Sequence, residues 1–468
     1  MHKLNSPKFF IYTGHVGFIL LMALSVFFYQ ERVLFIDTVF QFFKIVNFEH
    51  FNIEAARYGT FITQIPVLAA LKAGAGLKTL ALVYSLSFIA VYYGVFILCA
   101  HILKNTAAGL AVLFSLVICV SKSFYHPCTE THQAIVYSLL VYALLRFSFR
   151  HALIKYLLAG AAMLLSFYSH PVALFTVLFV IFFYVTEQKK WHEKGNYLLL
   201  LVIIALTLAK LLTAREGSYE SSFFNELFSF RYSASNIYHS YSFRFFIKRL
   251  PGMYFWTGIV FILAITMLFL KKQKFTAFYV LFSSAIFFFI TLVTYSKGDA
   301  DVMMERSFMP LAVFALLPFF VALEQFRGAK WHIFAPILLV VIFTVSVARI
   351  VGEGKISRNR VAYVMGIIDG TKAAPGRKFL LEKTGEVKQS VLYTWPFAFT
   401  TLVASSLEGP ENSRTIYLYD NAENIMKYAN GEMGHIFLGA DFWLEWQSDV
   451  LNKKYFSLPF GKYTFLQQ

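Results

Sequence analysis

Charged residues are scarce in this chain of 468 residues. Asp, Glu, Lys and Arg make up 15% of it, whereas a soluble protein carries about a quarter. Hydrophobic residues make up 58%, and Phe alone occupies 54 positions. This composition excludes an ordinary soluble protein. It predicts a polytopic membrane protein, whose spans satisfy their backbone groups internally as α-helices.

Cysteines are also few, three in all. Cys99 and Cys119 fall in apolar segments, and only Cys128 lies in a predicted loop. This distribution excludes a disulfide framework and a metal site of the usual cysteine spacing. The chain also lacks an HExxH motif. We therefore predict no dedicated metal site, but the DxD spacing at 299–301 leaves a divalent cation open as a cofactor.

Apolar runs long enough to cross the hydrocarbon core, about 30 Å thick, occur about eleven times. We expect transmembrane helices at 9–29, 79–101, 105–122, 131–149, 153–169, 171–186, 195–213, 251–270, 275–295, 307–325 and 331–350. The run 61–71 is too short to span and predicts an interfacial or re-entrant helix in the first outer loop. The middles of the spans carry almost no charge, and no internal repeat is visible.

The basic residues indicate the orientation. Lys and Arg gather in one set of short loops, which alternate with loops that hold most of the acidic residues. Because short basic loops stay on the cytoplasmic side, we expect a cytoplasmic N-terminus and, from the odd span count, an external C-terminus. The net charge of +16 thus reflects orientation and does not indicate nucleic-acid binding. We expect an integral protein of the bacterial inner membrane whose working face is periplasmic.

The chain after residue 350 has a different composition, with charges and turn residues interspersed. Short β-like runs occur at 378–382, 390–394, 415–420 and 462–466, and helical patterns at 395–407 and 422–429. We therefore predict two domains, a transmembrane domain over 1–350 and a small α/β periplasmic domain over 351–468.

Asp37 is the first candidate for chemistry. It lies just past the exit of the first predicted span, flanked by apolar residues. Desolvating a carboxylate costs free energy, so a carboxylate retained there usually has a function, and it is suited to act as a general base toward a hydroxyl group. Glu54 and Arg57 would face one another on a helix. The alternative is an amphipathic helix on the membrane surface, with an ion pair worth at most about 1 kcal/mol.

Polar residues also cluster at three other outer loops. His126 and Glu130 have a spacing that suits a sugar or a divalent cation, and His170 occupies a tight turn. Glu305 and Arg306 enter the tenth predicted span, where the planar guanidinium fork of Arg306 suits a phosphate. The alternatives are histidines satisfied by their neighbours and an arginine that snorkels to the interface.

These features resemble the GT-C superfamily of polytopic glycosyltransferases. Those enzymes have a cytoplasmic N-terminus, an acidic residue near the exit of span one, interfacial helices in the first outer loop and often a soluble domain after the last span. Asp37 resembles the catalytic carboxylate of that loop, although Thr38 follows it in place of a second acid. Segments 57–58 and 64–66 resemble the basic and proline-bearing part of the same loop. Segment 305–310 resembles the Arg-aromatic-Pro motif, with Ser307 in place of the aromatic residue.

The resemblance implies hexosyl or pentosyl transfer from a polyprenyl-phosphate donor to a glycan, lipid or protein acceptor on the outer face. It implies that Asp37 is the catalytic base. The candidate substrate- and lipid-phosphate-binding residues are Arg57, Glu54, His126, Glu130, His170, Glu305 and Arg306. Two alternatives stay open, a lipid or glycan transporter and a non-catalytic membrane assembly factor. Transporters commonly have inverted repeats and ionisable residues near the membrane midplane, and the sequence shows little of either.

Overall fold

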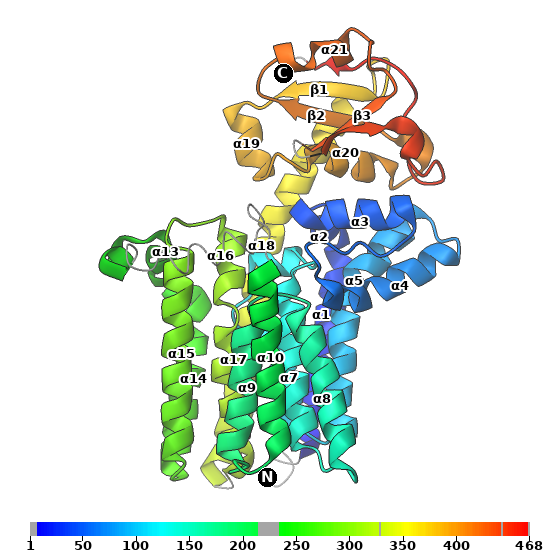
Figure 1. Cartoon of the computed structure of the whole chain (residues 1–468). Helices are drawn as coiled ribbons and strands as arrows, with labels where there is room; N and C mark the ends of the chain where they lie inside the picture. Colours follow the sequence, from blue (N-terminus) through cyan, green and yellow to red (C-terminus); the bar gives the residue numbers. More distant parts are fainter. Residues whose placement is uncertain (1–6, 214–233, 327–328, 441–442, 467–468) are drawn as a thin grey trace.

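The computed structural model describes residues 7–213, 234–326, 329–440 and 443–466. Helices dominate it, and most of them stand side by side in one bundle (Figure 1). Among the described residues, seven helical segments are long and apolar enough to cross a membrane: Phe9–Phe27, Leu77–Ile102, Lys194–Leu212, Tyr241–Leu270, Lys274–Thr294, Asp301–Gln325 and Phe334–Gly370. The prediction of a helical, integral membrane protein is confirmed at this level.

Four of the eleven predicted spans form shorter helices. These are α6 (Thr106–Ser115), α7 (Glu130–Arg146), α8 (Ala152–Phe167) and α9 (Ala173–Glu187). The other helices of the bundle are α1 (Pro7–Phe27), α5 (Leu77–Ile97), α10 (Lys194–Thr213), α14 (Phe255–Leu270), α15 (Lys274–Thr294), α17 (Leu311–Gln325) and α18 (Ala329–Gly370). Two short helices, α13 (Tyr241–Arg249) and α16 (Asp301–Phe308), precede α14 and α17. The count of eleven spans therefore stays a prediction.

The first outer loop folds into helices that lie across the end of the bundle (Figure 1). After α2 (Tyr29–Val33) come α3 (Ile36–Phe48) and α4 (Phe61–Lys72). Helix α4 coincides with the apolar run that is too short to span, and its transverse direction is that of an interfacial helix. Helix α3 buries one face, which includes Val39 and Phe42. The first loop is thus a platform at the end of the bundle that faces the C-terminal domain.

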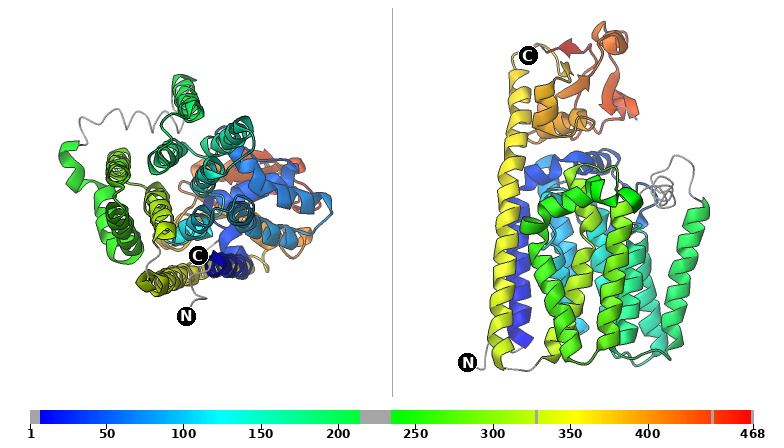
Figure 2. Two further views of the ribbon diagram at one scale, coloured as in Figure 1. Left: turned by 90° about the horizontal axis from the view of Figure 1, so that it is seen from below. Right: turned by 90° about the vertical axis from the view of Figure 1, so that its left-hand side faces the viewer.

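Helix α18 joins the bundle to the C-terminal domain. It runs unbroken for 42 residues, alongside α1 and on into the domain (Figure 2). It therefore passes the predicted domain boundary at 350/351 without interruption. Its outer part is tied to α2, because Arg358 pairs with Glu31 at 2.9 Å and Arg360 donates to the backbone carbonyl of Glu31. The spacing of the domain from the bundle is thus set by a rigid helix.

The C-terminal domain contains two small sheets. Strands β2 (Thr415–Tyr419), β1 (Lys378–Glu382) and β5 (Thr464–Phe465) lie in that order and pair in parallel. Strands β3 (Ile436–Ala440) and β4 (Trp443–Gln447) form an antiparallel pair. Helices α19 (Gly385–Val391), α20 (Phe397–Ser406) and α21 (Met426–Ala429) complete the domain. The prediction of a small α/β region near the C-terminus is confirmed.

One predicted strand of this domain is wrong. Residues 385–391 form α19, so the β-like run 390–394 falls on the end of a helix and the turn after it. The hydroxyl of Thr384 accepts a hydrogen bond from the N–H of Val387 and caps that helix. The cap satisfies a donor that a helix start leaves unpaired, and it outweighs the β propensity of the residues that follow. Strands β3 and β4 are not predicted from the sequence.

Aromatic side chains hold the C-terminal domain on the first-loop platform. The ring of Phe43 on α3 lies 5.0 Å from that of Phe399 on α20 and 5.3 Å from that of Phe456. Phe40 lies 5.7 Å from Trp395, edge to face. Such pairs add to the burial of their large apolar area. The domain is therefore seated directly over α3, the helix that begins beside Asp37.

Lys378 is a buried ammonium group inside the C-terminal domain, with 2% of the residue exposed. Its Nζ donates to the carbonyl oxygens of Gly434 at 2.8 Å and Ile436 at 3.0 Å, and to the hydroxyl of Ser448 at 3.1 Å. Burial lowers the pKa of Lys378 to about 8. These three bonds join β1 to the β3–β4 pair.

We expect Lys378→Met to lower the stability of the C-terminal domain. The change removes the donor to one buried and one part-buried carbonyl, at a cost of about 2–3 kcal/mol. Thermal unfolding of the purified protein in detergent would show a lower Tm. Lys388→Met is the matched control, because Lys388 is exposed and its only described ion pair is long, 3.7 Å. Equal Tm values for the two variants would contradict the bonding role of Lys378.

Candidate active site

Six of the eight candidate residues lie together at the end of the bundle that faces the C-terminal domain. This polar cluster consists of Asp37, Arg57, His126, Glu130, His170 and Arg306. Its members come from the first loop, from the start of α7, from the turn between α8 and α9, and from α16. The remaining two candidates, Glu54 and Glu305, have other partners.

Glu130 is the centre of the polar cluster. Its two carboxylate oxygens accept from different arginines, Oε1 from Arg57 Nη1 at 2.7 Å and Oε2 from Arg306 Nη2 at 2.9 Å. The three side chains are only 10–15% exposed. Ion pairs at this depth are screened less by salt than surface pairs. Two guanidinium groups on one carboxylate leave one positive charge, which the nearby carboxylate of Asp37 balances.

A strained turn positions Arg57. The two residues before it, Ala55 and Ala56, have φ values of 48° and 54°, in the left-handed region where a Cβ costs about 1–2 kcal/mol per residue. The Arg57 N–H closes the turn by donating to the carbonyl of Glu54 at 2.9 Å. Strain of this kind persists only where the surroundings enforce it. Here the turn brings Arg57 to Glu130.

The predicted pairing of Glu54 with Arg57 is wrong. Residues 54–57 form this turn instead of a helix, so the two side chains do not face one another. Glu54 pairs with Lys44 of α3 at 2.6 Å, and its side chain is 48% exposed. Glu54 therefore lies on the outside of the first loop, and its part in substrate binding has no support from its surroundings.

Glu305 anchors α16. Its carboxylate accepts from the backbone N–H groups of Ser121 at 2.6 Å, Lys122 at 3.0 Å and Ser123 at 2.9 Å, and from the hydroxyl of Ser123. The residue is 2% exposed. Its acceptor sites are thus occupied by the chain itself, which corrects the prediction that Glu305 contacts a substrate. By holding α16, it fixes the position of its neighbour Arg306.

Asp37 begins α3 and stands at the open side of the polar cluster. Its carboxylate lies 3.3 Å from Nε2 of the buried His126, and its side chain is 45% exposed. The residue before it, Ile36, has a φ of 37°, a rare conformation for a β-branched residue. Such outliers gather at functional sites. Asp37 is thus both accessible and held in a defined direction.

The surroundings keep Asp37 ionised. Burial by itself would raise the pKa of the Asp37 carboxyl group, but the hydrogen bond from His126 and the electrostatic attraction of His126, Arg306 and Arg57 lower it below the usual value. The start of α3 adds the favourable end of a helix dipole. His126 is oriented in turn by Thr129, whose hydroxyl lies 3.2 Å from Nδ1. The result is an oriented carboxylate.

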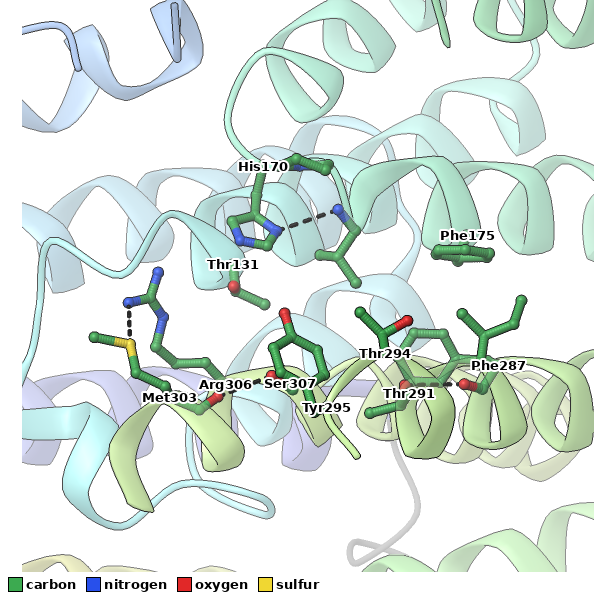
Figure 3. A pocket seen from close by; sticks show the side chains of 13 residues that line it. Thr131, His170, Phe175, Phe287, Thr291, Thr294, Tyr295, Met303, Arg306 and Ser307 are labelled. Atoms are coloured by element: carbon green, nitrogen blue, oxygen red, sulfur yellow. Dashed lines mark hydrogen bonds between the residues drawn. The ribbon is translucent and has the colours of Figure 1, made fainter. Parts of the chain in front are cut away.

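A narrow cavity opens beside Arg306 and His170 (Figure 3). Figure 3 shows both side chains facing this space, with the rings of Phe175 on α9 and Phe287 on α15 at its other end. The cavity is therefore polar at one end and apolar at the other. The division matches the polarity of a ligand with an anionic head and an apolar tail, but the cavity has a volume of only about 40 Å³ and would have to widen to admit one.

His170 presents a donor to this cavity. Burial first, and then the charges of Arg57 and Arg306, lower the pKa of His170 well below its usual value, so its ring is neutral. The N–H of Val172 donates to Nδ1 at 3.2 Å, which leaves the proton on Nε2. In the part of the chain that the structure describes, the buried hydroxyls of Thr131 and Thr294 have no hydrogen-bond partner, and both line the cavity.

The DxD segment is engaged in ion pairs and local hydrogen bonds. Asp301 pairs with Lys122 and with Arg249, each at 2.8 Å, and Asp299 accepts from the N–H of Ala300. Among the described residues, no group of three or more metal-ligating side chains comes together. The divalent cation that the sequence leaves open thus gains no support from Asp299 or Asp301.

Two aromatic residues of the C-terminal domain, Tyr393 and Trp395, contact the residues around Asp37, and the sequence does not predict that they belong to the site. Tyr393 packs against Phe35, with ring centroids 5.9 Å apart, and Trp395 packs against Phe40. They are more than 350 positions away from Asp37. No local pattern marks them, because only the docking of the domain brings them there. Asp37 therefore lies between the polar cluster and an aromatic wall.

Comparison of the chain with protein families, with curated proteins and with solved structures finds no match. Its function therefore has to follow from the geometry of the polar cluster and of the spaces around it.

We expect Glu130→Ala to destabilise the protein by about 3 kcal/mol, because it removes the carboxylate that lies between two poorly exposed guanidinium groups. Removing one arginine as well, in Glu130→Ala with Arg57→Ala, should cost less than the sum of the two single changes. The measurement is thermal unfolding in detergent. Glu54→Ala serves as control, since an exposed pair such as Glu54–Lys44 is worth at most about 1 kcal/mol. A Tm for Glu130→Ala equal to that of the control would contradict the central role of Glu130.

Proposed function

We propose that the protein is an integral-membrane glycosyltransferase of the GT-C type. It moves a sugar from a polyprenyl-phosphate donor to an acceptor on the face that carries the C-terminal domain. One observation supports this most. An accessible, ionised carboxylate, Asp37, lies in the same cluster as two arginines that both bind Glu130. Nucleophilic transfer from a phosphate leaving group needs both parts.

Asp37 acts as the base in this proposal. The acceptor hydroxyl oxygen attacks the anomeric carbon of the donor and forms the new glycosidic bond. The bond between that carbon and the phosphate oxygen breaks, and its electron pair leaves with the polyprenyl phosphate. The hydroxyl proton passes to Asp37. Because the pKa of Asp37 is low, the carboxylate takes this proton late, when attack has made the hydroxyl strongly acidic.

The two arginines stabilise the leaving phosphate. Arg306 lines the cavity beside His170, and both Arg57 and Arg306 retain positive charge in excess of Glu130. Preorganised cations in a partly dry site stabilise developing negative charge. His170 Nε2–H is a further donor at the same end. The apolar end, with Phe175 and Phe287, would take the first carbons of the polyprenyl chain.

The position of the site fits an external, lipid-linked reaction. The residues of the polar cluster come from the first loop, the start of α7, the α8–α9 turn and α16, and these elements meet at the end of the bundle beneath the C-terminal domain, beside the transverse helices α3 and α4 (Figure 1). A lipid donor with its tail in the bilayer presents its phosphate at this level. We propose accordingly that this end of the bundle is periplasmic and that the membrane is a bacterial inner membrane.

Replacing Asp37 by Asn tests the proposed base. We expect Asp37→Asn to reduce transfer from polyprenyl-phosphate sugars by about 10²–10⁴-fold, the usual contribution of a general base. The measurement is product formation by purified protein with membrane lipid extracts as acceptor source. Glu54→Gln is the control, because Glu54 lies in the same loop with an exposed partner.

The outcomes of this assay separate the alternatives. Full activity of Asp37→Asn would overturn the assignment of the base. Movement of the lipid-linked sugar across proteoliposomes without a covalent product would favour a transporter. Wild-type protein that neither transfers nor moves the lipid would favour an assembly factor.

Replacing His126 tests how Asp37 is kept ionised. We expect His126→Gln to raise the pKa of Asp37, because the hydrogen bond and charge that lower it are weakened or lost. The acid limb of the profile of kcat/KM against pH reports this group in the free enzyme, so it should move to higher pH while activity at neutral pH is retained in part. An acid limb at the wild-type position would contradict the role given to His126. Thr129→Val, which removes only the hydroxyl beside Nδ1, should give a smaller shift in the same direction.

A further inference from the structure

A second cavity lies on the other side of Phe35 from His126. It has a volume of about 320 Å³ and is enclosed by the outer part of α18, by Phe35 just before α3, and by the segment 389–392 of the C-terminal domain. Small-molecule sites in proteins measure about 300–1,000 Å³. The cavity does not share a lining residue with the one beside His170. A cavity of about 320 Å³ admits one or two sugar-sized rings.

The cations in its wall are already engaged. Lys122 pairs with Asp301 at 2.8 Å. Arg360 lies over the ring of Phe35, 4.2 Å from its centroid, and donates to a backbone carbonyl. The wall also carries the carboxylate of Glu353, which would repel an anion. The charges of this cavity therefore do not select an anionic ligand.

The groups that are open to a ligand are uncharged and polar. Asn359 and Gln389 line the cavity from α18 and from α19, and both are exposed. Ser357 and Ser390 also line the cavity, and the hydroxyl of Ser390 is engaged in a hydrogen bond with Tyr363. Amides and hydroxyls both donate and accept hydrogen bonds. They can therefore pair with the hydroxyl groups of a sugar, which also donate and accept.

Two side chains, Phe35 and His126, lie between the cavity and the proposed base. Phe35 lines the cavity and meets the ring of His126 edge to face, with centroids 5.8 Å apart. His126 in turn contacts Asp37. Leu392 of the C-terminal domain lies at the rim of the cavity. Its backbone φ of 65° is rare for a residue other than glycine. A ligand held here would lie beneath the C-terminal domain, separated from Asp37 by Phe35 and His126.

We propose that this cavity is a binding site for an uncharged sugar ring, and that it holds the acceptor. The role of acceptor rests on the proposed transferase function. The binding of a neutral sugar does not depend on that function. The C-terminal domain thereby takes part in choosing the acceptor, through Gln389 on its side of the cavity and Asn359 on α18.

Binding is tested without any transfer reaction. Purified protein in detergent micelles is mixed with the methyl glycosides of glucose, galactose, mannose and N-acetylglucosamine, and with methyl glucuronide as the anionic comparison. Saturation-transfer NMR reports which glycoside contacts the protein. The variants are Asn359→Ala with Gln389→Ala, the exposed controls Lys355→Ala with Lys388→Ala, and Asp37→Asn.

We expect at least one neutral glycoside to bind, with an affinity that falls about tenfold in the Asn359/Gln389 variant through loss of its hydrogen bonds. The control variant and Asp37→Asn should bind as the wild type does. Absence of binding by every neutral glycoside, a preference for the glucuronide, or unchanged affinity in the Asn359/Gln389 variant would overturn the proposal.

The transfer assay separates this proposal from the proposed function. With an active wild type, the Asn359/Gln389 variant should raise the acceptor KM about tenfold, with the donor KM unchanged. If neutral glycosides bind through Asn359 and Gln389 and the wild type transfers nothing, the sugar site stands and the transferase function fails. If transfer occurs with unchanged acceptor KM in the variant, the function stands and the acceptor site fails.

Discussion

The end of the bundle beneath the C-terminal domain depends on a single carboxylate that two arginines share. Glu130 joins Arg57 of the first loop to Arg306 of α16, residues that are far apart in the sequence. Because the three side chains are poorly exposed, an unpaired charge there would carry a large desolvation cost. The first loop, α7 and α16 are thus constrained to one arrangement. The positive charge that remains beyond Glu130 acts on Asp37, whose pKa both arginines lower.

The rest of the site is organised around that constraint. Glu305, bound by three backbone amides, holds α16 so that Arg306 reaches the shared carboxylate. Ile36 carries local backbone strain, and the polar and aromatic contacts of its neighbours hold Asp37 at the open side. The continuous helix α18 and the aromatic contacts of Phe43 then seat the C-terminal domain over α3. The cavity between α18 and that domain exists only because this seating is rigid.

Much of the fold follows from local patterns in the sequence. Long apolar runs predict the seven spanning segments, and the run that is too short to span predicts the transverse helix α4. Strands β1, β2 and β5 and helix α20 also match their patterns. The errors arise where a local rule meets a competing contact. Spacing suggests an ion pair of Glu54 with Arg57, but a turn of left-handed residues replaces the helix that the rule assumes.

The sequence by itself determined that the chain enters a membrane, and that Asp37, Arg57, Glu130 and Arg306 belong at the ends of apolar segments. These are consequences of hydrophobicity and of the cost of charge, both of which act locally. Only the tertiary structure decided which of these charges meet, because ion pairs across 73 and 176 residues have no local signature. It also separated the anchoring role of Glu305 from the open position of Asp37. Both are carboxylates near apolar runs, and only their surroundings differ: three amides around one, and a histidine and an exposed face for the other.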